Sequence, residues 1–220
     1  MADTVQVSLR LPSDGRCRCS GSHESGLTMR PPVAVLFARS DSVYKTIARC
    51  DVFDLERDAL TWPGGSPLIA HPPCRSWARL RHFAKPLPGE RSLAIHAVEQ
   101  VRRYGGVLEH PIGSQLWPLA GLPSPGAPRD AFGGWTLPIR QHWFGHRADK
   151  STLLYVVGCE PPAIPAFPLR LDRPTHVVGL YSGRDRATAR PSISKAEREH
   201  TPVDLAIWLV ELASRCRVPS

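Results

Sequence analysis

Apolar runs alternate with amphipathic segments along the chain from residue 31 onwards. Val33–Phe37, Pro67–Ala70 and Ser151–Gly158 are continuous apolar runs, which are typical of strands buried on both faces. Cys50–Asp54 alternates polar and apolar residues and predicts a short strand or a sheet edge. Val107–Pro111 begins like a strand and stops at a proline. The pattern therefore predicts several short strands in one sheet.

Two segments predict amphipathic helices. Apolar residues recur at helical spacing from Glu90 to Tyr104, and two glycines follow. The last segment, Pro202 to Cys216, has an apolar face, with Thr201 as the expected N-cap. A helix between two buried strands is typical of a parallel β-α-β unit. We expect an α/β fold with a Rossmann-like, mostly parallel sheet flanked by helices.

The first 30 residues have a different composition from the rest. They are polar and rich in Gly and Ser, which is typical of a mobile N-terminal extension. Met29 stands directly before the ordered part, so we hypothesise that it is the natural start. We expect residues 31–220 to form a single domain, with a short basic, irregular insertion around residues 159–195 that is rich in proline.

The chain has a net charge of +8, with more Arg than Lys. Such an excess favours a polyanionic partner, DNA first, although a merely basic surface has the same composition. We expect a cytoplasmic protein without a membrane segment, because the chain has neither a signal peptide nor about 18 consecutive apolar residues. We also expect a monomer. The cysteines and histidines match no metal-ligand spacing, so no metal site is expected.

The stretch Leu68–Trp77 joins an apolar run to chemically reactive residues. Pro72 and Pro73 cannot continue a strand, so Cys74 is expected in a stiff loop at the carboxyl end of a strand. Ligands bind at that edge of open α/β sheets. Glu109 ends the next predicted strand, and we expect both side chains at the same edge, on neighbouring strands.

Cys74 and Glu109 together have the groups needed to activate a pyrimidine. A thiolate can add to C6 of the ring, which makes C5 a nucleophile, while a carboxyl group at the N3 edge donates a proton. A base in duplex DNA has to be flipped out for this attack. The alternatives are a buried structural thiol and a capping or ion-paired carboxylate.

Basic and aromatic residues follow Cys74 and suit phosphate and base contacts. The alternative for this segment is a solvated loop with one buried tryptophan. Arginines in the proline-rich insertion are further candidates. The residues expected to contact nucleic acid are Arg75, Trp77, Arg79, Arg81, Arg184 and Arg186.

These motifs resemble those of the DNA (cytosine-5) methyltransferases. Pro72-Pro73-Cys74 is similar to the catalytic Pro-Cys motif of that family, with Ala70-His71 where glycines usually stand. Val107–Pro111 is similar to the Glu-Asn-Val motif, and Thr201–Ala206 to the closing motif. The resemblance implies a reduced methyltransferase-like domain, a short and divergent, phage-like member of the family.

The resemblance also implies further roles. Arg147 and Lys150 are the residues most similar in position to the family's basic catalytic motif. The implied cofactor is S-adenosyl-L-methionine. Its expected contacts are Phe37, Asp41, Asp54 and Thr201. The chain departs from the family after the first strand, where Phe37–Asp41 replaces Phe-x-Gly-x-Gly.

Two other functions are compatible with the same residues. One is a pyrimidine C5 transferase with a folate one-carbon donor, in which the cysteine has the same role. The other is a catalytically inactive, methyltransferase-like protein that binds DNA; the missing glycine motif favours it, whereas the retained Cys74 and Glu109 oppose it.

Overall fold

Six strands form one sheet in the order β2-β1-β3-β4-β6-β5. The computed structural model describes residues 31–79, 81–179 and 190–218. The strands are β1 (Val33–Leu36), β2 (Cys50–Phe53), β3 (Leu68–Ala70), β4 (Gly106–Pro111), β5 (Trp135–Arg140) and β6 (Ser151–Val157). The predicted strands around residues 33, 50, 67, 107 and 151 are thereby confirmed.

The sheet is mostly parallel. β2, β1, β3 and β4 run parallel to one another, whereas β6 is antiparallel to both β4 and β5. The hairpin register pairs Arg140 of β5 with Ser151 of β6. The architecture is mixed α/β, with helices flanking the sheet, and it is compatible with a Rossmann-like fold.

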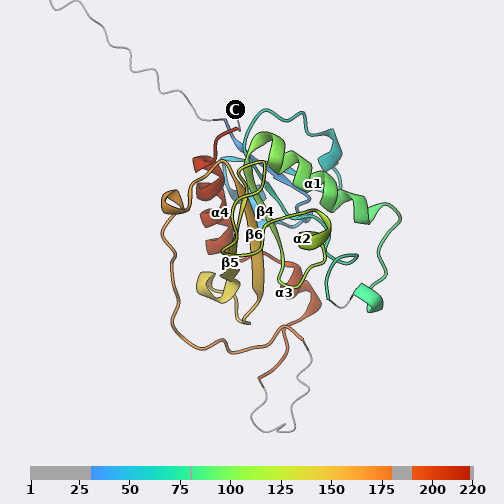
Figure 1. Ribbon diagram of the computed structural model, residues 1–220. Helices are drawn as coiled ribbons and strands as arrows, with labels where there is room; N and C mark the ends of the chain where they lie inside the picture. Colours follow the sequence, from blue (N-terminus) through green and yellow to red (C-terminus); the bar gives the residue numbers. More distant parts are fainter. Residues whose placement is uncertain (1–30, 80, 180–189, 219–220) are drawn as a thin grey trace, which may run out of the picture. The chain divides into compact units, whose positions relative to one another are not determined.

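Helices cover both faces of the sheet (Figure 1). α1 (Glu90–Tyr104) packs its small apolar residues on the face formed by Leu36, Leu68 and Leu108. α4 (Val203–Arg215) packs on the opposite face. Two shorter helices are α2 (Leu116–Leu119) and α3 (Lys195–Glu199). Five 3-10 helices complete the described elements: Val43–Thr46, Ala59–Thr61, Arg81–Phe83, Gln141–Phe144 and Pro161–Ala163.

Two details differ from the sequence-based expectations. No strand was predicted over β5, because Pro138 interrupts its apolar pattern; β5 is an edge strand, and edges tolerate proline. The prediction of Thr201 as N-cap is wrong. Pro202 is the N-cap of α4, since its ψ of 145° is extended, and no side chain caps this helix.

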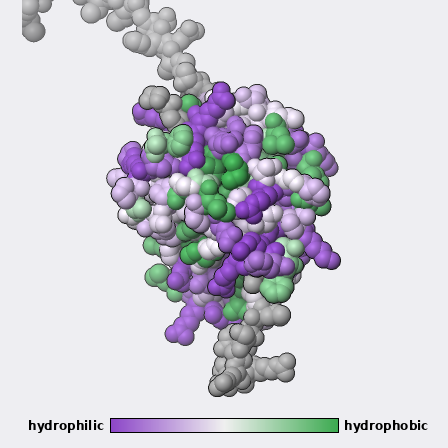
Figure 2. All heavy atoms as spheres, turned by 45° about the vertical axis from the view of Figure 1, so that its right-hand side comes forward, coloured by the Kyte–Doolittle hydropathy of each residue, from purple (hydrophilic) through white to green (hydrophobic). Residues whose placement is uncertain are grey.

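The surface mixes hydrophilic and hydrophobic side chains, with the hydrophobic ones in separate groups in the view of Figure 2. Within the described ranges, no helix combines the length and the hydrophobicity that crossing a membrane requires. The expected N-terminal extension, residues 1–30, and two expected DNA contacts, Arg184 and Arg186, lie outside the described residues.

Candidate active site

A cleft of about 1730 Å³ opens at the carboxyl edge of the parallel strands. Phe37 follows β1, His71 and Cys74 follow β3, Glu109 lies in β4, and all four line the cleft. The chain passes from β1 to β2 on one side and then to β3 on the other, so the strand order reverses between β1 and β3. Open α/β sheets bind ligands at such a switch point.

The loop that carries Cys74 is fixed by backbone bonds and by an indole ring. The carbonyl of Cys74 accepts from the amides of Trp77 (3.0 Å) and Ala78 (2.8 Å). Trp77 is 2% exposed, and its indole N–H donates to the carbonyl of Arg91 at 3.2 Å. The guanidinium of Arg91 lies 4.2 Å from the centre of the Trp77 ring. The two prolines and this tryptophan hold the cysteine in one position.

An ion pair ties the same loop to α1. Arg75 lies against Glu90, with Nε to Oε1 at 3.0 Å and a terminal nitrogen to Oε2 at 2.7 Å. The Glu90 side chain is buried and also accepts from the amide of Leu87 at 3.0 Å. Arg75 lines the cleft, but its guanidinium already has a carboxylate partner.

Glu109 belongs to a chain of polar groups that crosses four elements. Its Oε2 lies 3.3 Å from Nδ1 of His71, and its Oε1 accepts from the side-chain amide of Gln141 at 3.0 Å. The Tyr44 hydroxyl lies 3.0 Å from Nε2 of His71. Tyr44 follows β1, His71 follows β3, Glu109 lies in β4 and Gln141 follows β5. The network therefore joins the ends of these strands.

The surroundings of Glu109 favour its ionised form. Burial alone would raise the pKa of this carboxyl, but the hydrogen bond from His71 and the positive charge of Lys150 lower it to about 2. The carboxylate is therefore charged at neutral pH, and in this state it accepts hydrogen bonds.

Cys74 is in the opposite state. Burial and the negative charge of Glu109 raise the pKa of the thiol above its ordinary value, and the positive charge of Lys150 opposes this shift. The resting group is therefore a protonated thiol. Lys150 acts on both groups, lines the cleft, and has no hydrogen-bond or ion-pair partner for its side chain within the described part of the chain.

Comparison with protein-family models, curated proteins and solved structures finds no match.

The two expected basic catalytic residues lie in different places. Lys150 lines the cleft, whereas Arg147 does not line it. Arg147 is half exposed and pairs with Glu197 of α3, with Nε to Oε1 at 2.7 Å. In this arrangement Arg147 is paired with α3, whereas Lys150 lines the cleft and its charge acts on both Cys74 and Glu109.

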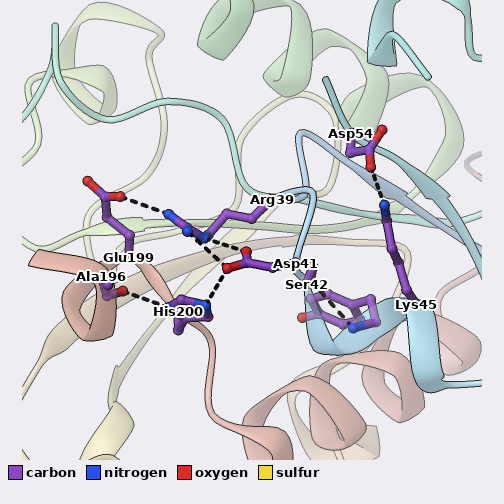
Figure 3. A network of polar contacts seen from close by, with 9 residues as sticks. Arg39, Asp41, Ser42, Lys45, Asp54, Ala196, Glu199 and His200 are labelled. Carbon is purple, nitrogen blue, oxygen red and sulfur yellow. Dashed lines mark hydrogen bonds and ion pairs between the residues drawn. The ribbon is translucent and has the colours of Figure 1, made fainter. Parts of the chain in front are cut away.

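Three of the four expected cofactor contacts line the cleft: Phe37, Asp41 and Thr201. Asp54 does not line it and pairs with Lys45 at 2.5 Å (Figure 3). Asp54 also accepts hydrogen bonds from two backbone amides. Phe37 has a φ of 61°, a left-handed conformation that is uncommon outside glycine. This is the position at which nucleotide-binding sheets usually turn through glycine.

Asp41 belongs to a second network, at the rim of the cleft (Figure 3). It lies 2.8 Å from Nε of Arg39 and 3.0 Å from Nε2 of His200, and Arg39 also pairs with Glu199 at 2.8 Å. Arg39, and to a lesser extent His200, lower the pKa of Asp41 to about 2. These exposed ion pairs connect the loop after β1 to α3 and the residue that follows it.

Only some of the residues expected to contact nucleic acid line the cleft. Arg75 and Arg79 line the cleft, and Arg81 does not. Trp77 is packed in the core against α1, so its ring is not open to a base. For Trp77 the structure therefore agrees with the alternative interpretation, in which a basic loop surrounds one buried tryptophan.

Sequence reasoning missed His71, Tyr44 and Gln141 as neighbours of Glu109. His71 had a usable signal, since it ends a buried strand just as Glu109 does. Tyr44 and Gln141 lie in 3-10 helices without a periodic pattern. Among the described residues, no group of three or more His, Cys, Asp and Glu side chains is arranged to hold a metal ion.

Proposed function

We propose that the protein is a DNA-modifying transferase that acts on C5 of cytosine through a covalent bond between Cys74 and C6. The observation that carries the proposal is the arrangement of Cys74, Glu109 and Lys150 around one cleft at the switch point of the sheet. A soft nucleophile, a carboxyl group and an unpaired cation are the groups that this chemistry needs.

The proposed reaction moves one proton within the site before attack. The resting state has a thiol at Cys74 and a carboxylate at Glu109, whereas attack needs a thiolate and an acid. The thiol proton has to pass to the pair formed by Glu109 and His71 against the order of the two pKa values, so binding of the base must lower the pKa of the thiol or raise that of Glu109. Sulfur then bonds to C6, N3 takes the proton from Glu109, and C5 becomes a nucleophile. After transfer, water takes the C5 proton, the bond between C6 and sulfur breaks to release the Cys74 thiolate, and N3 returns its proton to Glu109.

Adenosylmethionine, the donor that the resemblance implies, would supply an electrophilic methyl group when bound. The acidic contacts expected for it do not fit. Asp54 lies outside the cleft, and the carboxylate of Asp41 is held by Arg39 and His200. The cleft exceeds the size of most single-ligand pockets, which leaves room for a one-carbon donor beside a base.

Covalent trapping tests the proposal. An oligonucleotide with 5-fluorocytosine blocks loss of the C5 substituent, so the wild-type protein should form an adduct that survives denaturation and is seen by intact mass. Adenosylmethionine and a methylene folate would be supplied in separate arms. Cys74→Ser should abolish the adduct, and Cys50→Ser is the matched control, because Cys50 lies on edge strand β2 outside the cleft. No adduct in either arm would refute the mechanism.

The role of His71 has its own test. Carbon-13 NMR of glutamate carboxyl groups, assigned with Glu109→Gln, should give a pKa for Glu109 of about 2 in the wild type. His71→Asn should raise this pKa, because burial raises the pKa of Glu109 and the hydrogen bond from His71 that lowers it is lost. Adduct formation should fall about 100-fold, as expected for a lost acid–base partner.

The matched control is His96→Asn, which changes a histidine that packs on Phe37 and does not line the cleft. An unchanged Glu109 pKa in His71→Asn would remove His71 from the proton path.

A second candidate function is a DNA-binding protein that no longer catalyses transfer. The raised pKa of the Cys74 thiol and the poor fit of the acidic donor contacts favour it. It predicts DNA binding without any adduct, and no thermal shift with either one-carbon donor.

A further inference from the structure

The negative side chains around the cleft have partners within the protein, whereas most of the positive ones have none within the described part of the chain. Every carboxylate that lines it has a partner within the protein: Asp41 with Arg39, Glu109 with His71, Asp149 with Arg140, and Glu199 with Arg39. By contrast, most of the lining cations have no ion-pair or hydrogen-bond partner for their side chains among the described residues. These cations are Arg79, Lys85, Lys150, Lys195 and Arg198.

The unpaired cations occupy two sides of the cleft. Arg79 and Lys85 belong to the segment that follows the Cys74 loop, and Lys195 and Arg198 belong to α3. All four are exposed, whereas Lys150 is half buried. The cleft therefore has an uncompensated positive rim that is built from two segments distant in the sequence, and Cys74 and Glu109 line the same cleft.

An exposed aromatic ring stands next to this rim. Phe83 lines the cleft and is 86% exposed. It is the last residue of a short 3-10 helix and lies between Arg79 and Lys85 in the sequence. The other phenylalanine and the tyrosine of the cleft are not free in this way. Tyr44 is 1% exposed, and Phe37 packs edge-to-face with His96.

Cations alternating with an exposed ring are what a single nucleic-acid strand requires. Its phosphates pair with the cations and its unpaired bases stack on the ring, whatever their identity. A base inside a duplex is already stacked on both faces and cannot use Phe83. Trp77, the more obvious aromatic residue of this segment, is buried and cannot take the role.

We propose that the rim formed by Arg79, Phe83, Lys85, Lys195 and Arg198 binds a single-stranded stretch of DNA and that Phe83 stacks on a base of this strand. The choice of DNA rests on the proposed function. The strand would present an unpaired pyrimidine to the floor of the cleft without prior separation of a duplex.

Binding measured without any one-carbon donor tests the inference. The Cys74→Ser protein would be titrated with a fluorescent strand of about 12 nucleotides, within the range of single-strand site sizes. Parallel arms use the duplex of the same sequence, the RNA strand and deoxycytidine monophosphate. The single DNA strand should bind tightest. Phe83→Ala should weaken its binding about tenfold or more, as measured for stacking residues.

The matched control is Phe132→Ala, which removes an exposed phenylalanine that does not line the cleft. Salt dependence isolates the charges. Each cation that meets a phosphate of a single strand contributes about −0.7 to the slope of log K against log salt, so Lys85→Gln with Arg198→Gln should reduce the slope by about 1.4. Arg103→Gln, on the exposed side of α1, should leave it unchanged.

Several outcomes would overturn the inference. They are equal or tighter binding of the duplex, of the RNA strand or of the mononucleotide, and loss of binding in Phe83→Ala no greater than in Phe132→Ala. Because the assay contains no donor and uses Cys74→Ser, its result is independent of adduct formation. Binding without adducts contradicts the proposed reaction alone, and adducts with duplex-preferring binding contradict the strand inference alone.

Discussion

The loops that follow β3 and β1 lie on either side of the switch point and are held in different ways. The loop after β3 carries Cys74 and is fixed by the buried Trp77 and by Arg75 on a buried carboxylate, Glu90. The loop after β1 carries Asp41 and is held by exposed ion pairs with Arg39 and His200. The Cys74 loop is therefore fixed by burial, whereas residues 39–41 on the other side, ahead of the buried Tyr44, are held by surface charge.

The difference determines which side of the cleft can change shape. A buried ring with a hydrogen-bonded indole holds its neighbours in one arrangement, because any other leaves a cavity or an unpaired N–H. Exposed ion pairs contribute little each and are screened by salt. We expect the side with the nucleophile to keep its geometry, and the side with α3 to adjust to a ligand.

The largest expected effect comes from removing Trp77. Trp77→Ala should reduce the free energy of unfolding by about 3–5 kcal/mol, as for other buried aromatic residues, and should make Cys74 react faster with thiol reagents. Urea unfolding and mass-spectrometric labelling would measure both. Trp62→Ala, a partly buried tryptophan against Tyr104, is the control for labelling. Equal labelling of Cys74 in wild type and Trp77→Ala would mean that Trp77 does not fix the loop.

A smaller effect is expected from Glu90→Gln. This change leaves Arg75 without its carboxylate partner but keeps an oxygen for the amide of Leu87. The loss should be about 1–2 kcal/mol, below that of a fully buried pair because Arg75 is partly exposed. Chemical denaturation measures it, with Glu99→Gln on the exposed side of α1 as control. If Glu90→Gln loses no more stability than Glu99→Gln, the ion pair between Arg75 and Glu90 stabilises the Cys74 loop no more than surface ion pairs stabilise the loop after β1.

The smallest effect is expected on the other loop. Asp41→Asn should lower the Tm slightly at low salt, and the difference from wild type should vanish near about 1 M salt. Because the pKa of Asp41 is lowered to about 2, its contribution is complete above about pH 4 and is lost as pH falls toward 2. Thermal unfolding at two salt concentrations and two pH values tests this. A difference that persists at high salt would contradict the view that this loop is held by surface charge.

The sequence was sufficient to place the strands that carry Cys74 and Glu109. Apolar runs ending in proline located β3 and β4, and the helix between them implied parallel neighbours at one edge. The bounds of α1 followed from its apolar spacing and the glycines after it. These features depend on local periodicity, which a single sequence contains.

The hydrogen-bond partners of Glu109 and the burial of Trp77 could not be predicted from local periodicity. Tyr44 and Gln141 reach Glu109 because β1 and β5 end at the same edge, and the position of β5 depends on a hairpin that Pro138 concealed. Trp77 lies among basic residues, so its local pattern is that of a surface segment. Its burial involves contacts with Arg91 of the next helix, which the local pattern of the loop does not contain.

The antiparallel pairing of β6 makes the charge of the cleft sensitive to insertions and deletions. Lys150 stands at the beginning of β6 and not at the end of a strand, and it reaches the carboxyl edge because β6 runs against β4. The amide of Gln141 donates to the carbonyl of Lys150 at 2.8 Å, which fixes this register. A shift of one residue would bring Asp149 to the position of Lys150, since neighbouring residues in a strand exchange sides. A one-residue change in length between β5 and β6 would then replace the ammonium beside Glu109 with a carboxylate or, for a shift in the other direction, with the hydroxyl of Ser151, so this short hairpin should tolerate substitutions far better than changes in length.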